Sequence, residues 1–357
     1  MAIIVGFPGS NPLLQGTAAT DAIFGNGLGN ISGVAGSDRI FGLGGDDEIT
    51  GDGVNILASG KGGNDLIQGG DGDDIIWGDA SGTLYGIGGN DVLYQNAGDF
   101  GRMRGDAETI ATGGRGGNDK LYGGGELIGD AYDDVTSVVS GHDLLSARSA
   151  AIGSDLVGDV WNYLYGTSVG GNDTLQGSNF DDRLYGESTH DLSGASLGGN
   201  DKLWGFGGDD ILYGDANGVD SIAIAGKDVL RGGAGNDIIY GDAGDLYDFA
   251  AGGADQLHGN AGDDELWGDG ILNDDAVGGA DKFFFSGNFG DDTIFDFRTE
   301  DGDQLILQGL TQSEVQLTIV SLANPNDSLQ LTTLGDDSIT LVGFTGSLTP
   351  GVDIVFA

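Results

Sequence analysis

Short apolar segments recur along the chain at a fixed distance from aspartate residues. In residues 60–79, GKGGNDLIQGGDGDDIIWGD, each of two nine-residue units has a glycine-rich turn, an Asp at its sixth position (Asp65, Asp74) and an aliphatic residue two places later (Ile67, Ile76). Side chains alternate between the two faces of a strand, so this aliphatic residue would face inward. The pattern predicts three-residue strands joined by turns of glycine, which adopts positive φ without steric cost.

A longer period groups these units. Between Asp38 and Asp281 the first Asp of each group recurs every 24 to 30 residues, with a mean spacing of 27. Each group holds two nonapeptides and a third unit that begins with Gly-Asp or Gly-Glu and then varies in sequence and length. Variation at one point of each repeat is expected of a solenoid with its loops on one face. We therefore expect coils of about 27 residues, for which a three-sided shape is the natural option, in a rod roughly 48 Å long.

Three parts of the chain differ in character. Residues 1–32 form a lead-in and a degenerate repeat, and residues 33–282 carry the repeats, which are degenerate after Asp91 and Asp119. From residue 283 glycine becomes sparser, and alternating segments such as VQLTIV and DSITLVGF indicate ordinary strands. A solenoid must cover its last open rung, so residues 283–357 are expected to form a β cap. The expected class is an all-β parallel solenoid with this cap.

The charge of the chain points to bound cations. The sequence has 57 acidic and 13 basic residues, a formal net charge of −44, and would repel itself when compact. Regularly spaced hydrophobic residues argue against disorder. Nucleic acid and anionic membranes are unsuitable partners for this charge, and no apolar run has the length for membrane insertion. There is no cysteine, and the N-terminus lacks the basic and apolar regions of a secretion signal.

Three columns of acidic residues are the candidate metal ligands, because Ca²⁺ takes six to eight oxygens. The first column contains the first Asp of each group: Asp38, Asp65, Asp91, Asp119, Asp143, Asp173, Asp201, Asp228, Asp255 and Asp281. The second contains the second-unit Asp: Asp47, Asp74, Asp155, Asp182, Asp210, Asp237, Asp264 and Asp292. The third contains the Asp that begins the third unit: Asp52, Asp79, Asp106, Asp159, Asp215, Asp242 and Asp269.

Each column has an alternative explanation without a metal. An Asp at the end of a turn can form an Asx-turn. Recurrence in register would stack the carboxylates of the first two columns and leave them in need of a cation, so we expect metal there. For the third column, a ligand role and a turn-capping role are both open.

The nonapeptides GGDGDDIIW (69–77), GFGGDDILY (205–213) and GGAGNDIIY (232–240) follow the pattern GGxGxDxUx. Over roughly residues 16–295 the chain resembles the RTX (repeats-in-toxin) hemolysin-type calcium-binding repeat proteins. The resemblance implies a right-handed parallel β-roll with Ca²⁺ between successive turns, held by the position-six Asp and by glycine carbonyls. That family uses two nonapeptides in each coil, whereas the period of this chain corresponds to three nine-residue units. The tail is similar to serralysin-like caps, and its final residues 353–357 resemble the signal read by type I secretion machinery.

No enzyme is expected, because the three histidines are scattered and the Gly-x-Ser-x-Gly strings around Ser168 and Ser196 lie where glycine is abundant. The expected function is a secreted, non-catalytic calcium-binding solenoid that folds outside the cell. It would act there or at the cell surface as a scaffold, for a surface layer, matrix or adhesion, with self-assembly as an option. The alternative is a carbohydrate- or partner-binding module with an outward aromatic stripe. Stacking between rungs would also explain these aromatic residues. The stripe would contain Trp77, Tyr94, Tyr122, Tyr185, Trp204, Tyr213, Tyr240 and Trp267.

Overall fold

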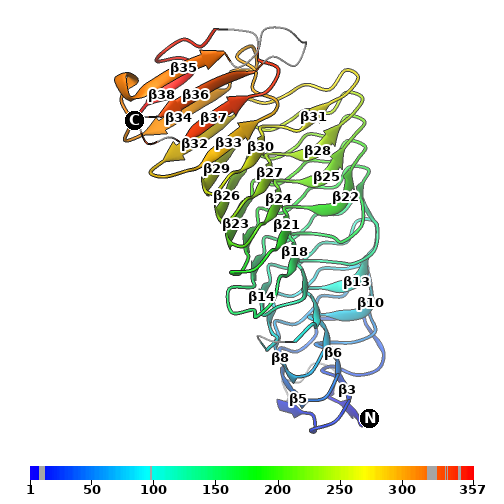
Figure 1. Ribbon diagram of the computed structural model, residues 1–357. Helices are drawn as coiled ribbons and strands as arrows, with labels where there is room; N and C mark the ends of the chain where they lie inside the picture. The colour runs from blue at the N-terminus through cyan, green and yellow to red at the C-terminus, as the bar shows by residue number, and fades with distance from the viewer. Residues whose placement is uncertain (8–12, 97–98, 320–327, 334, 336, 345–346) are drawn as a thin grey trace.

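The computed structural model describes residues 1–7, 13–96, 99–319, 328–333, 335, 337–344 and 347–357. The chain forms a rod of stacked coils, with the N-terminus at one end and the last strands at the other (Figure 1). Residues 97–98 of the degenerate repeat after Asp91, and the last residue of the VQLTIV segment, lie outside the described residues. The described part has no helix with the length and apolar character that crossing a bilayer requires.

Each complete coil contributes to three faces, which we name sheets A, B and C. Sheet A contains, in spatial order, β1 (Ile3–Val5), β3 (Ala22–Phe24), β6 (Glu48–Thr50), β9 (Ile75–Trp77), β12 (Arg102–Arg104), β15 (Glu126–Ile128), β18 (Asp155–Val157), β21 (Arg183–Tyr185), β24 (Ile211–Tyr213), β27 (Ile238–Tyr240), β30 (Glu265–Trp267), β33 (Asp291–Ile294), β37 (Ser338–Leu341), β36 (Leu329–Thr333) and β35 (Val315–Ile319).

Sheet B contains β2 (Leu13–Gln15), β5 (Arg39–Gly44), β8 (Leu66–Asp71), β11 (Val92–Tyr94), β14 (Lys120–Tyr122), β17 (Leu144–Ser146), β20 (Thr174–Gln176), β23 (Lys202–Gly207), β26 (Val229–Ala234), β29 (Gln256–Ala261), β32 (Lys282–Ser286), β34 (Gln304–Gln308) and β38 (Ile354–Phe356). A 3₁₀ turn, η1 (Gln312–Glu314), precedes β35.

Sheet C is the face formed by the variable third unit, and it has two parts. One contains β4 (Asn30–Ile31), β7 (Asn55–Ile56), β10 (Ala80–Leu84) and β13 (Ala107–Ile110); the other contains β16 (Val135–Thr136), β19 (Leu164–Tyr165), β22 (Ser188–Leu192), β25 (Ala216–Val219), β28 (Ala243–Leu246) and β31 (Ile271–Leu272). The single-residue bridge between Ala107 and Ala131 continues this face between the parts. The predicted all-β solenoid with about 27 residues in each coil is confirmed, and the coil is three-sided.

Like residues stack on like between coils. In sheet B, Leu203 pairs in parallel with Leu175 and Leu230, and in sheet A, Leu212 pairs with Leu184 and Ile239. All of these central side chains are fully buried, as the alternation of the short strands requires. Register is fixed because a slip by one residue would expose every one of them.

The apolar interior is divided into two clusters. The larger cluster lies between sheets A and B and includes Ile67, Ile76 and Leu212. The smaller one lies beneath sheet C and includes Ile56, Leu84 and Val219. The position-six Asp of the first unit immediately precedes each sheet B strand from β5 to β32, and the Asp of the third unit lies between sheets A and C, so both fall where the two clusters meet.

The ends of the rod are built differently. At the N-terminus, β1 and β2 already pair in parallel with the first repeats, so the lead-in is part of the coil. At the other end sheets A and B continue through β32, β33 and β34, and the first antiparallel pairing is between β37 and β36. A domain boundary at residue 283 stays a prediction.

Candidate metal centres

The second-unit Asp residues lie at the corner where the chain turns from sheet B to sheet A. We call their column the turn ladder. The backbone N–H of Asp210 donates to Oδ1 of Asp237, and that of Asp237 donates to Oδ1 of Asp264, both at 2.9 Å. The second oxygen of each of these carboxylates is buried without a hydrogen-bond partner. One oxygen therefore links coils, and the other is left for a ligand.

Five of these turns share a backbone that makes room for a ligand. They are the turns with positive φ at positions two and four: Leu43 and Gly45, Gly70 and Gly72, Phe206 and Gly208, Gly233 and Gly235, and Asn260 and Gly262. Position one is Gly in each, and a Cβ built at Gly205 would lie 2.1 Å from Asp210 Oδ2 and 2.7 Å from the Gly232 carbonyl oxygen. A carboxylate and a carbonyl of the next coil thus converge where only glycine fits.

Burial makes these carboxylates difficult to ionise without a cation. Desolvation raises the pKa of Asp47, Asp74 and Asp264 to about 6 and that of Asp210 to about 8, against an ordinary value of 3.8. A bound divalent ion would reverse this effect, because it stabilises the charged form.

The turn ladder is interrupted in the middle of the rod. Position six is occupied there by Gly101, Gly125 and Ser154, as the pairing of Met103, Leu127 and Leu156 in sheet A shows. At Asp74, the last carboxylate of the turn ladder before this interruption, the Gln95 amide takes the place of a ligand. Its Nε2 donates to the Gly72 carbonyl at 2.7 Å and to Asp74 Oδ2 at 3.3 Å.

The assignment of Asp155 to this column was wrong. The connection from Asp143 to Leu156 is longer than the corresponding one from Asp65 to Ile76, so Ser154 is in register with Asp182, whose Oδ1 accepts the Ser154 N–H. Asp155 lies one place further on, where side chains face outward. It forms an ion pair with Arg183 at 3.6 Å and is 37% exposed.

The first-unit and third-unit carboxylates lie inside the coil and face one another. We call them the interior file. Its first-unit side is a continuous ladder in which each Asp N–H donates to Oδ1 of the next, from Asp38 to Asp65 at 2.6 Å and onward to Asp281, which donates to Asp303. Its third-unit side accepts hydrogen bonds from the glycine turns; Asp79 Oδ2, for example, accepts the Gly89 N–H at 2.7 Å.

Unpaired oxygens are concentrated in this file. The following Oδ2 atoms are buried without a hydrogen-bond partner: Asp65, Asp91, Asp119, Asp143, Asp173, Asp201, Asp228, Asp255 and Asp281. They point at the glycine that precedes each third-unit acid. A Cβ at Gly78, for instance, would lie 2.1 Å from Asp91 Oδ2 and 1.8 Å from the Gly105 carbonyl oxygen. Each coil therefore offers carboxylate and carbonyl oxygens around a small space.

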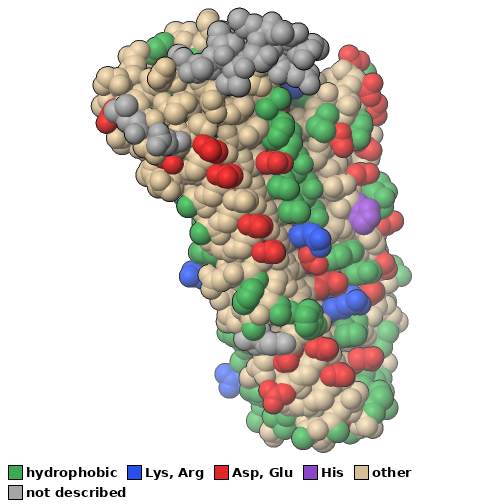
Figure 2. Space-filling view, viewed as in Figure 1, with side chains coloured by type: hydrophobic (Ala, Val, Ile, Leu, Met, Phe, Trp, Pro, Cys, Tyr) green, Lys and Arg blue, Asp and Glu red, His purple; other side chains and the backbone are tan. Residues whose placement is uncertain are grey.

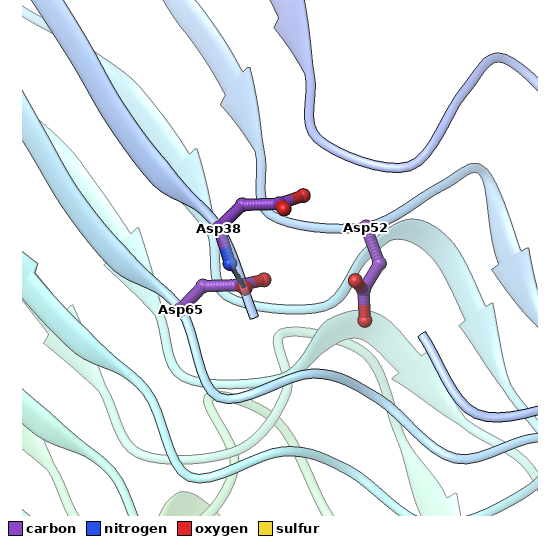
Figure 3. Close-up of side chains that lie close together, drawn as sticks. All are labelled: Asp38, Asp52 and Asp65. Carbon is purple, nitrogen blue, oxygen red and sulfur yellow. Dashed lines mark hydrogen bonds between the residues drawn. The ribbon is translucent and has the colours of Figure 1, made fainter. Parts of the chain in front are cut away.

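At two places three carboxylate oxygens of the file lie within 4.8 Å of one another. One group is Asp38, Asp52 and Asp65, and the other is Asp215, Asp228 and Asp242. Figure 3 shows Asp38 and Asp65 on neighbouring strands, with Asp52 across from them on the opposite side of the coil. Such a set of hard, anionic oxygens suits Ca²⁺. The turn-capping role that was open for the third column is seen at Asp52, which accepts the Gly63 N–H. The ligand role stays a prediction.

Inside the file, repulsion between carboxylates adds to the effect of burial. Desolvation, followed by the neighbouring carboxylates, raises the pKa of Asp228 and Asp242 well above the ordinary value. Asp228 is raised by Asp215, Asp255 and Asp201 in turn, so the repulsion extends from coil to coil. Several adjacent carboxylates buried in this way need protons or cations, and calcium fits the oxygens present.

The set of candidate ligands omitted several members of the file. Asp130 and Glu187 begin their third units, as the Gly-Asp or Gly-Glu pattern indicated, and both are fully buried. Asn26 takes the corresponding position in the first repeat. Asp303 and Asp296 extend the two sides into the cap. The Asp-x-aliphatic pattern of Asp303 could have revealed it, whereas Asp296 lacks the preceding glycine.

The outward aromatic residues stack on one another. Tyr185, Tyr213, Tyr240 and Trp267 form a row with ring centroids 4.6 to 4.9 Å apart and nearly parallel planes. Figure 2 shows hydrophobic side chains in a band along the rod. Because the ring faces cover each other, this arrangement favours packing between rungs over a carbohydrate platform. Ser168 and Ser196 are fully buried, and their hydroxyls donate to backbone carbonyls three residues earlier.

Comparison with known proteins agrees with this geometry. A family model of the RTX calcium-binding nonapeptide repeat (4 copies) matches residues 24–55, 57–81, 167–192, 196–217, 223–245 and 249–270. No curated protein matches the chain. The unmatched residues 82–166 include the three coils in which the turn ladder lacks its carboxylate. RTX nonapeptide repeats bind calcium, and the acidic groups found here fit several Ca²⁺ ions. The chain therefore carries RTX calcium-binding nonapeptide repeats, which form a β-solenoid.

Proposed function

We propose that this protein is a secreted, non-catalytic solenoid that folds when it binds Ca²⁺ outside the cell and then serves as an extracellular structural scaffold. The observation that carries the proposal is the array of buried carboxylates with unpaired oxygens. Uncompensated charges of this kind are incompatible with a compact rod. A cation that binds only the folded chain removes the conflict.

The energetics favour a switch that depends on calcium concentration. The glycine-rich backbone loses much conformational entropy on folding, and the acidic residues repel one another. Each site that binds only the folded state adds roughly RT ln(1 + [L]/Kd) of stability. Extracellular calcium modules bind at roughly 10⁻⁴–10⁻³ M, so the chain would stay unfolded in a low-calcium cytoplasm and fold after export.

Two features support export and the absence of catalysis. The C-terminal Ile354–Phe356 strand is preceded by Asp353, and we propose that type I secretion machinery reads this segment before the chain folds. The hydroxyls of Ser168 and Ser196 are enclosed and bonded to the backbone, so they are not available as nucleophiles.

A calcium titration followed by far-UV circular dichroism tests the folding step. The signal should change from that of an unfolded chain to that of β-structure as Ca²⁺ is added, and EGTA should reverse it. Mg²⁺ at the same concentration is the control and should have a much weaker effect, because Mg²⁺ gives up its water reluctantly. Equal β-structure in EGTA and in Ca²⁺ would contradict the proposal.

The scaffold role has its own test. Electron microscopy of the full chain with and without Ca²⁺ should show sheets or filaments only with the ion. Monodisperse single rods at high protein concentration in Ca²⁺ would contradict self-assembly and leave calcium-dependent folding intact.

A further inference from the structure

We propose that the interior file is a separate class of calcium site, whose ions are enclosed by the protein and whose two ends are closed by Asn26 and Arg298. This inference rests on calcium binding in the proposed function. It concerns where the ions are held and how they leave, and it can fail while calcium-dependent folding stands.

At the N-terminal end an amide takes the place of an ion. Asn26 occupies the third-unit position of the first repeat. Its Nδ2 donates to Asp38 Oδ2 at 2.8 Å, to Asp52 Oδ1 at 2.7 Å and to the Gly36 carbonyl at 3.2 Å. These acceptors are the kinds of oxygen that the later coils direct at a cation. The amide contributes N–H donors without adding a negative charge, so the file can end there.

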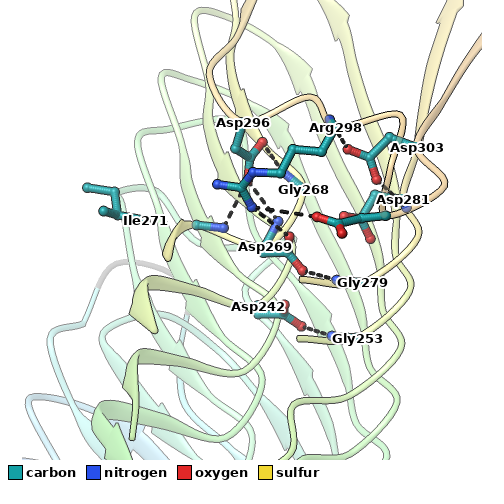
Figure 4. Close-up of polar contacts among 12 residues, drawn as sticks. Asp242, Gly253, Gly268, Asp269, Ile271, Gly279, Asp281, Asp296, Arg298 and Asp303 are labelled. Carbon is teal, nitrogen blue, oxygen red and sulfur yellow. Dashed lines mark hydrogen bonds and ion pairs between the residues drawn. The ribbon is translucent and has the colours of Figure 1, made fainter. Parts of the chain in front are cut away.

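At the C-terminal end of the file a guanidinium takes the place of an ion. The third-unit side ends at Asp296, which accepts the N–H groups of Gly268, Asp269 and Gly270. Arg298 Nη1 lies 3.9 Å from Asp269 Oδ2 and 3.8 Å from Asp301 Oδ2. Figure 4 shows this guanidinium above Asp269 and beside Asp296, while the backbone N–H of Arg298 donates to Asp303 Oδ2. It supplies positive charge at the last rung.

The groups that flank the file are apolar or largely neutral. The two apolar clusters flank it. On the outer side, the residues at position five of the first unit form a ladder of neutral groups over much of its length: the Asn90 N–H donates to Asn64 Oδ1, and the Asn118 N–H donates to Asn90 Oδ1. The turn ladder differs, because its position-five residues include Asp46, Asp73, Asp209 and Asp263, and those acidic residues are exposed beside the ligands.

The consequence is two rates of ion release. An ion in a turn can leave past exposed carboxylates while the rod stays folded. An ion in the interior file must wait for coils to open, so its release follows local or global unfolding. Calcium-loaded full chain mixed with an excess of a fluorescent chelator should therefore release its ions in two phases, the slower at least about tenfold slower than the faster.

Three variants separate the classes. Asp237→Asn should reduce the amplitude of the fast phase only. Asp228→Asn, in the same coil, should instead reduce the amplitude of the slow phase. Arg298→Gln should raise the slow rate by about tenfold, because opening now begins at an unsealed end. Arg183→Gln, which removes an outward ion pair, is its control and should leave both rates unchanged.

A variant that gains a calcium site tests the proposal even if the other variants fail to fold. Asn26→Asp restores a carboxylate beside Asp38 and Asp52, and should raise the calcium content of gel-filtered protein by about one ion per chain. The proposal is overturned if release has a single phase in the parent chain, if Arg298→Gln leaves the slow rate unchanged, or if Asn26→Asp binds no additional calcium.

Discussion

The two acidic arrays of this rod differ although both use the same Asp-x-aliphatic unit. The turn ladder has acidic residues on its outer side and is interrupted in the middle of the molecule, where Gly101, Gly125 and Ser154 replace the carboxylate. The interior file has largely neutral residues outside it and continues from Asp38 to Asp303. The difference teaches that a coil can lose a turn site and remain in the stack, whereas every coil from Asp38 to Asp281 keeps its interior carboxylates.

The reason lies in what each array holds together. A turn connects two neighbouring strands and can be closed by other donors, as Gln95 does at Asp74. The interior file joins the sheet C arm to the body formed by sheets A and B. Without bound cations, the carboxylates of the file would repel one another between the two apolar clusters. We therefore expect changes to the file to have larger effects than equivalent changes to the turns.

The largest effect should come from pH in the absence of calcium. Carboxyls whose folded pKa is raised stabilise the fold while protonated, and this contribution is lost as the pH rises through the folded value. For the turns that pKa is about 6 for Asp264 and about 8 for Asp210, and inside the file burial raises the pKa of Asp228 well above its ordinary value. The chain in EGTA should thus gain β-structure by circular dichroism between about pH 8 and about pH 4.

With calcium the dependence should reverse, because the ligands must be ionised to bind the ion. The midpoint of a calcium titration should move to higher calcium as the pH falls. A calcium-free chain that is equally unfolded at both pH values would show that protons cannot replace the ion.

The second prediction compares glycines of the two arrays. Gly78→Ala places a methyl group 1.8 Å from the Gly105 carbonyl oxygen, which is backbone and cannot move aside. It should cost more than about 3 kcal/mol in the free energy of unfolding measured with urea in Ca²⁺. Gly205→Ala meets the movable Asp210 side chain first and should cost less. Gly33→Ala is the control, since nothing lies within 4 Å of the added atom. Equal losses for Gly78→Ala and Gly205→Ala would remove the distinction between the arrays.

The third prediction concerns the interruption of the turn ladder. Gln95→Ala leaves Asp74 Oδ2 and the Gly72 carbonyl without their amide partner, so the calcium-loaded chain should lose about 1–3 kcal/mol of stability. The exposed Gln68 of β8 provides the matched control, Gln68→Ala. A stable Gln95→Ala chain that binds one more calcium ion would mean that the amide excludes an ion from a complete site.

The smallest effect is expected from the aromatic row. Tyr213→Leu removes two stacking contacts, at 4.9 and 4.8 Å, and keeps an apolar side chain. The loss in the free energy of unfolding should be about 0.5–1.5 kcal/mol. A glycan array with the parent chain in Ca²⁺ completes the test. Glycan binding that disappears in this variant would favour the carbohydrate-binding alternative.

Much of the fold follows from spacing. The aliphatic residue two places after each Asp, as in Ile67 and Leu212, determines which residue of a three-residue strand is buried, and the 27-residue period determines the coil. Prediction from spacing fails where the period changes. The longer connection before Leu156 places Ser154 at the sixth position of the second unit, and Asp155 was assigned to that position because it is acidic.

The candidate site was harder to predict than the fold. The sequence shows that Asp52 and Asp65 recur in columns, but not that the two columns meet inside the coil, because this depends on the path of the variable third unit. The closing roles of Asn26 and Arg298 were invisible for the same reason. Asn26 lies in a degenerate repeat and Arg298 lies beyond the last repeat, and only their contacts reveal them.

The stacking of like on like gives the rod a unit of length. Each coil contacts mainly its two neighbours, so a duplication or loss of one whole coil of about 27 residues would change the length by about 4.8 Å and recreate the same contacts at the new junction. A nine-residue change would instead place a sheet A strand over a sheet B strand. Proteins of this design can therefore change length in evolution only in steps of a full coil.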